Sequence, residues 1–189
     1  MNVASNVALA LACTAALVVT AIASPPPHQR DGGSATQQAL AALPADARKV
    51  SSLRRAEVDG LLSGRGLGLA SAAELNGYPA PYDVLAFADE LGLDADQHGA
   101  VQQAYDRMKS KAVEAAARYV AAEHALDQAF RSQASPTLLT ERVGAAERRR
   151  AELRLIHLAA HLEISPLLTA KQRQLLGELQ GTGARSENH

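Results

Sequence analysis

Two histidines one helical turn apart are the residues of this chain best suited to chemistry. They bound the sequence His157-Leu158-Ala159-Ala160-His161. Residues four apart lie one above the other on a helix face, so both imidazoles can reach a single ion. Imidazole is a common ligand of divalent Zn, Ni, Co and Cu. The spacing therefore indicates a site for a divalent transition metal. The alternative is that His157 is a hydrogen-bonded core residue.

Further ligands would come from a facing helix or from the same one. Counting back across the turn that precedes the histidine-bearing helix places His161 opposite Met108, whose thioether is a soft ligand. Glu114 and Glu163 offer carboxylate oxygens near the same level. The predicted ligand set is therefore His157, His161, Met108, Glu114 and Glu163. Met108 has the alternative role of filling the core.

Three other residues bear on this prediction. Lys111 and Arg107 fall at the level of the histidines and would repel a cation. Glu74 lies on a short helix that must pack somewhere, so it is a ligand of unknown position.

The sequence does not predict an enzyme. It contains no Gly-x-Ser-x-Gly or His-Glu-x-x-His motif. The single Cys13 lies in an N-terminal apolar run and is not expected to act as a nucleophile. The carboxylates of the long helices predict no catalytic pair, because a charge-rich helix face is ordinarily solvated. The glycine cluster at 63–68 has no preceding strand and no following Lys-Ser or Lys-Thr, so it predicts a hinge or a close-packing point rather than a phosphate loop.

Two long helices must position the histidines. Residues 94–97 have the form of a capping box, and apolar residues then recur at alternating steps of four and three over 101–129. After a turn at 132–136, the same stepping continues over 139–164. A short turn makes two helices antiparallel neighbours. The sequence thus predicts an all-α fold built on a long antiparallel helical hairpin.

Shorter elements are expected around this hairpin. Short helices are predicted near 52–62, 67–75 and 82–91, and a second capping box at 169–172 begins a final helix to about Leu179. We assign residues 51–180 to the hairpin domain. The Pro-, Gly- and Gln-rich segment 24–50 predicts a flexible tether, and 181–189 a disordered tail.

Composition supports the helical class and excludes one kind of partner. The 189 residues include four Tyr, two Phe and no Trp, which argues against a β-sandwich or barrel. The net charge of −1 lacks the basic surface that nucleic-acid binding requires. The helix seams are mostly Ala, so a lone hairpin buries little apolar area. We therefore expect a homodimer and no nucleic-acid partner.

The N-terminus predicts export. An uncharged apolar run ends in Ala21-Ile22-Ala23 and is followed by a proline-rich segment, which fits a secretory signal peptide over residues 1–23. No Lys or Arg precedes the run, so the alternative is an uncleaved anchor in the inner membrane. Cleavage after Ala23 would leave a mature chain without Cys.

The chain resembles the LTxxQ superfamily of periplasmic stress proteins. The matching motifs are Leu168-Thr169-Ala170-Lys171-Gln172 after the second long helix and the related Leu93-Asp94-Ala95-Asp96-Gln97 before the first. The superfamily includes Spy/CpxP-type chaperones, zinc-resistance-associated proteins and CnrX-type heavy-metal sensors. This sequence departs from the pattern in having Asp94 where the motif has Thr.

The resemblance implies two functions. Members of the sensor branch bind divalent metal through a His and a second ligand one turn later, shortly before the closing motif, where His157 and His161 fall. They act with a membrane-bound signalling partner. Members of the chaperone branch are cradle-shaped dimers that hold unfolded proteins without ATP. The first expectation is thus a periplasmic metal-binding stress protein, and the second is a chaperone for unfolded clients with no metal role.

Overall fold

The computed structural model describes residues 31–186, with side chains described for 34–181. Within that range the chain forms helices and turns and no strand, so the predicted all-α class is confirmed. The helices are α1 (Asp31–Ala41), α2 (Arg55–Leu62), α3 (Ser71–Glu74), α4 (Pro81–Ala86), α5 (Ala88–Leu91), α6 (Ala95–Arg131), α7 (Pro136–Ile164), the 3-10 helix η1 (Ser165–Leu167) and α8 (Ala170–Ser186).

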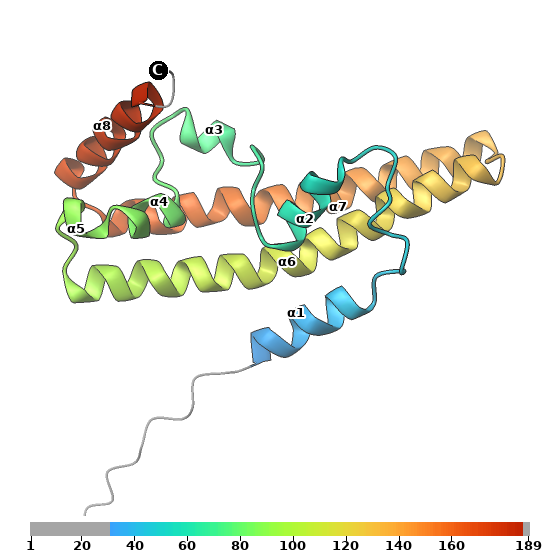
Figure 1. Ribbon diagram of the computed structural model, residues 1–189, viewed down its shortest axis with the longest axis horizontal. Coiled ribbons are helices and arrows are strands. Elements are labelled where there is room, and N and C mark those ends of the chain that lie inside the picture. Colours follow the sequence, from blue (N-terminus) through green and yellow to red (C-terminus); the bar gives the residue numbers. More distant parts are fainter. Residues whose placement is uncertain (1–30, 187–189) are drawn as a thin grey trace, which may run out of the picture.

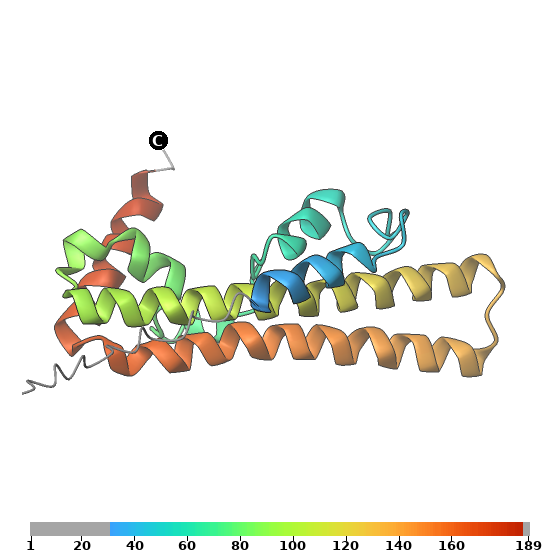
Figure 2. The ribbon, with the colours of Figure 1, turned by 90° about the horizontal axis from the view of Figure 1, so that it is seen from below.

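The helices α6 and α7 form the predicted long pair and lie side by side along their length (Figure 2). The Asp94 carboxylate accepts a hydrogen bond from the Gln97 backbone N–H at 2.7 Å, which begins α6. The Ser135 hydroxyl accepts one from the Leu138 N–H at 3.3 Å, and Pro136 follows in the first turn of α7. Local capping therefore sets where both helices begin.

The two motif glutamines meet at the far end of the pair from the connecting turn. Gln97 and Gln172 exchange two side-chain hydrogen bonds, each 3.1 Å long. The Gln97 amide also donates to the carbonyl of Leu167 at 2.8 Å. The Gln172 side chain accepts from the backbone N–H of Thr169 at 2.9 Å, as the second predicted capping box requires. Each cap thus also ties the starts of α6 and α8 together.

The shorter helices pack along the pair and divide the core in two. α1 and α2 pack on α6, α3 on α7, and α4 on both (Figure 1). One apolar cluster lies at the middle of the pair and includes Val58, Val120 and Leu153. The other cluster lies at the end of the pair away from the connecting turn and includes Val84 and Ile164. Along α7, the segment between Leu153 and Ile164 contains both histidines.

A buried carboxylate fixes the segment before α2 onto α6. Glu123 is 7% exposed, and its Oε2 accepts a hydrogen bond from the Ser52 hydroxyl at 2.6 Å. Burial, the Glu123 charge and a hydrogen bond with Glu123 raise the pKa of Tyr119 to about 12. Next to it, His124 Nε2 lies 3.2 Å from a carboxylate oxygen of Asp46, and this contact lowers the pKa of Asp46. Both polar contacts hold residues 46–52 against the helix.

Two segments differ from the sequence prediction. The segment 31–50, expected to be tether, contains α1 and buries Ala47 and Val50 in the middle cluster. α8 continues to Ser186, past the predicted end at Leu179 and into the predicted tail. The predicted leader, residues 24–30 and residues 187–189 lie outside the described residues. Among the helices within the described range, none is long and apolar enough to cross a membrane.

Candidate metal site

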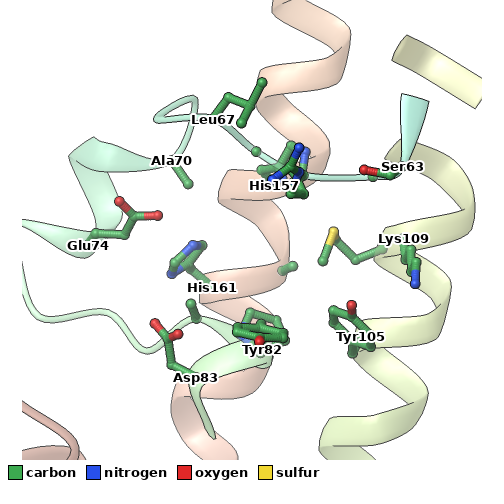
Figure 3. A pocket seen from close by; sticks show the side chains of 17 residues that line it. Ser63, Leu67, Ala70, Glu74, Tyr82, Asp83, Tyr105, Lys109, His157 and His161 are labelled. Atoms are coloured by element: carbon green, nitrogen blue, oxygen red, sulfur yellow. The ribbon is translucent and has the colours of Figure 1, made fainter. Parts of the chain in front are cut away.

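Both histidines line one cavity of about 600 Å³ that opens to solvent. α7 supplies His157 and His161 on one wall, and α6 supplies Tyr105, Met108 and Lys109 on another. The 63–67 loop, the end of α3 and the start of α4 complete the lining (Figure 3). The i, i+4 spacing on one helix therefore brings the two imidazoles into the same space, as the sequence predicts.

His161 is held in one tautomer by the backbone. Its ring is 4% exposed, and Nδ1 lies 3.1 Å from the carbonyl oxygen of Tyr78. A carbonyl only accepts hydrogen bonds, so Nδ1 carries a proton and Nε2 is the nitrogen that could offer a lone pair to a metal. A backbone carbonyl hydrogen-bonded to one ring nitrogen is an arrangement that orients metal-binding histidines through the other nitrogen.

His157 is buried with one ring nitrogen that has no hydrogen-bond partner. It is 6% exposed, and its Nε2 has no hydrogen-bond partner. Burial, together with the nearby His161, lowers the pKa of His157, so the ring is neutral at pH 7. A buried polar atom without a partner costs about 1–3 kcal/mol, so its presence calls for a reason. A neutral imidazole with an unused nitrogen is also the form that binds metal.

The loop beside His157 lies directly on the imidazole. A Cβ atom at Gly66 would lie 3.2 Å from His157 Nδ1, closer than side chains ordinarily approach. Gly64 has φ of 85°, a left-handed conformation that glycine adopts without strain. The glycine cluster is thus the close-packing point expected from the sequence, and what it packs against is the candidate ligand.

The other predicted ligands do not all reach this cavity. Met108 lines it. Glu163 instead pairs with Arg107 at 2.5 Å and lines a separate, smaller pocket, which shares Met108 and Ala160 with the histidine cavity. Glu114 is not part of the cavity lining. The Glu163 pair partly offsets the Arg107 charge that would otherwise oppose a cation.

Two carboxylates join the site from the short helices. Glu74, whose position the sequence left open, ends α3 and lines the cavity, and Asp83 enters from α4. Sequence reasoning missed Asp83, for which the only signal is the Gly- and Pro-rich turn at 76–81 that folds α4 back toward α7. Even so, no three His, Cys, Asp or Glu side chains of the described residues are placed to hold one metal ion together.

Comparison with known proteins adds no assignment: no family model, no curated protein and no solved structure matches this chain.

Proposed function

We propose that this chain is a periplasmic stress protein that binds a divalent transition metal through His157 and His161. The observation that carries the proposal is the state of the two rings. Both are more than nine-tenths buried, one is fixed in its tautomer by a backbone carbonyl, and the other has an unpartnered nitrogen. The lowered pKa of His157 keeps that ring neutral at pH 7, so it can ligate an ion without first losing a proton.

The residues fit a metal in their chemistry and leave its coordination incomplete. His157 and His161 would supply nitrogen, and Met108 a soft sulfur ligand from the facing helix. Glu74 and Asp83 line the cavity and favour a cation there. Zn, Ni, Co and Cu all accept nitrogen ligands, and the Met108 sulfur would favour the softer ions. Binding would couple α6 to α7, because its ligands come from both.

The wider setting rests on the sequence motifs. The paired LTxxQ-like segments support membership of the periplasmic superfamily, and the apolar leader supports export. The hairpin architecture, a homodimer and a membrane-bound signalling partner belong to the same proposal. Ala-rich helix seams that bury little area support the dimer.

Calorimetric titration with Zn²⁺, Ni²⁺, Co²⁺ and Cu²⁺ tests the metal site. We expect micromolar or tighter binding of at least one ion by the wild type. Replacing both rings, in the variant His157→Ala/His161→Ala, should weaken that binding about 100-fold or more, since even removing the groups that orient a ligating ring costs roughly 10- to 100-fold.

The matched control is His98→Ala, which removes an exposed histidine of α6 that is not part of the cavity lining. Its affinity should equal that of the wild type. Absence of binding, or equal binding by the double variant, would refute the metal proposal.

One observation favours the chaperone alternative. Leu155 and Leu162 of α7 are 66% and 62% exposed, and with Ala151 and Leu158 they form an apolar stripe opposite the buried face of the helix. Such a stripe can hold apolar segments of unfolded proteins. Suppression of aggregation of an unfolded client, lost in Leu155→Ser/Leu162→Ser and kept in the double histidine variant, would support this function instead.

A further inference from the structure

The histidine cavity is much larger than a single metal ion requires. Its volume of about 600 Å³ lies within the range of sites for small organic molecules. Two imidazoles fill only part of the coordination sphere of a divalent ion, and no third His, Cys, Asp or Glu of the described residues is placed to join them. A bound ion would therefore have coordination positions free for a further ligand in the rest of the cavity.

The charges that line this cavity are separated in space. Glu74 and Asp83 lie on the side of His161, whereas Lys109 lies across the cavity on α6, beside Tyr105 (Figure 3). Lys109 Nζ is 5.7 Å from the centre of the Tyr105 ring, and Lys109 forms no ion pair with any residue of the described part. Arg65, the other cation of the lining, lies on the 63–67 loop with its guanidinium beside Gly60 of α2. The cavity thus has an acidic end near His161 and a cation, Lys109, facing that end.

Two tyrosines form an aromatic wall that suits an organic ligand better than a bare ion. The rings of Tyr82 and Tyr105 lie with their centres 6.4 Å apart, one from α4 and one from α6. Tyr82 is 64% exposed, so this wall stands at the cavity mouth. Phenol hydroxyls donate hydrogen bonds, and a carboxylate accepts them. A bare metal ion accepts no hydrogen bond from a phenol, so the wall favours a ligand that carries carboxylates.

We propose that the cavity takes the divalent ion as its complex with a small carboxylate chelator. This inference rests on the proposed metal-binding function. The dication lies at His157 and His161, near the acidic end, and the chelator fills the open coordination positions. A carboxylate of the chelator faces Lys109. The dipole of the complex, positive at the metal and negative at the carboxylate, then matches the separated charges of the cavity.

Equilibrium dialysis with radiolabelled citrate, and in a parallel series with L-histidine, tests this inference. The purified protein is dialysed against each chelator with and without Ni²⁺, and bound nickel is measured as well. We expect at least one chelator to be retained, one per chain, only when nickel is present. The double variant His157→Ala/His161→Ala should retain neither nickel nor chelator.

The outcomes separate this inference from the proposed function. If nickel is retained in the presence of each chelator but neither chelator is retained with it, the inference is overturned and the metal site still stands. A chelator retained equally without nickel also overturns it, because the cavity would then be an anion site. If none of Zn²⁺, Ni²⁺, Co²⁺ and Cu²⁺, offered without a chelator, binds the wild type, the metal proposal itself fails.

A lysine pair supplies the matched variants. Lys109→Gln removes the cation that faces the chelator and introduces neither a thioether nor an imidazole that could bind the metal. It should lower chelator retention about tenfold, the value of one hydrogen bond to a charged group, and leave nickel affinity without chelator unchanged. Lys111→Gln, on the same helix but outside this cavity, should change neither. Equal effects of the two substitutions would overturn the assignment to Lys109.

Discussion

Glu123 on α6 and His157 on α7 are buried to nearly the same extent, 7% and 6% exposed, but their surroundings differ. Glu123 accepts a hydrogen bond from Ser52 and interacts with Tyr119. His157 has an Nε2 atom with no partner. A satisfied buried polar group stabilises the fold, whereas an unsatisfied one costs free energy and so points to a function. Burial alone does not separate the two cases, but hydrogen bonding does.

The difference follows from what each side chain faces. Glu123 faces the segment before α2, whose Ser52 hydroxyl can donate to it. His157 has the backbone of Gly66 against its Nδ1 side, and its Nε2 is buried with no hydrogen-bond partner. The chain therefore has a polar clamp at the level of Glu123 and an unsatisfied buried nitrogen at the level of His157.

Removing the acceptor of the clamp should have the largest effect on stability. Glu123→Leu leaves the Ser52 hydroxyl and the Tyr119 phenol without their partner and frees the segment before α2. We expect the free energy of unfolding to fall by about 3 kcal/mol, and the melting temperature by roughly 6–12 °C. Thermal and urea unfolding monitored by circular dichroism measure this loss. Glu123→Gln keeps an acceptor oxygen and should cost less than half as much; equal losses would show that hydrogen bonding is not the cause.

Removing the unsatisfied ring should have a smaller effect of opposite sign. His157→Leu replaces a buried polar atom without a partner by an apolar side chain, and we expect unfolding to require about 1 kcal/mol more. The same variant should lose metal binding. The control is His161→Leu, which deprives the Tyr78 carbonyl of its donor and should lower stability. A destabilised His157→Leu would mean that the ring is an ordinary core residue, which would remove the contrast with Glu123.

The pH dependence of stability should show the smallest effect. Burial, with His161 nearby, lowers the pKa of His157 below the value of 6.5 that it has in the unfolded chain. The unfolded state then binds more protons, so the contribution of the neutral ring is present above pH 6.5 and is lost as the pH falls through the lowered pKa. Melting temperatures between pH 7.5 and 5 should fall more steeply in the wild type than in His157→Leu. Parallel curves would contradict the burial argument.

Much of the fold could be predicted because its signals are local. The bounds of α6 and α7 follow from capping residues and from a long apolar period, both of which act within a few residues. The helix α1 has no such signal: its sequence, DGGSATQQALA, contains two glycines. What stabilises it is tertiary, including packing of Ala39 and Leu40 against the middle cluster and a 3.1 Å contact between Thr36 and Ser110 hydroxyls.

The candidate site divides in the same way. His157 and His161 share a cavity because their spacing on one helix is enough to place them together. Counting across the turn also places Met108 correctly at this level. The carboxylates could not be predicted by counting, since level along a helix does not fix which face a side chain occupies. Glu163 therefore lies on the Arg107 side, while Glu74 and Asp83 reach the cavity through short helices whose packing no local pattern specifies.

The paired amides of Gln97 and Gln172 affect motion at the end of the helix pair away from the connecting turn. Ends of helices ordinarily fray one at a time, with little cost to the rest of the chain. Here the first turn of α6 cannot open without breaking hydrogen bonds that also hold the first turn of α8. Backbone amides of the two turns should therefore exchange with solvent deuterium in a single event, although they lie 75 residues apart. An ion bound nearby would then slow exchange at both sites together.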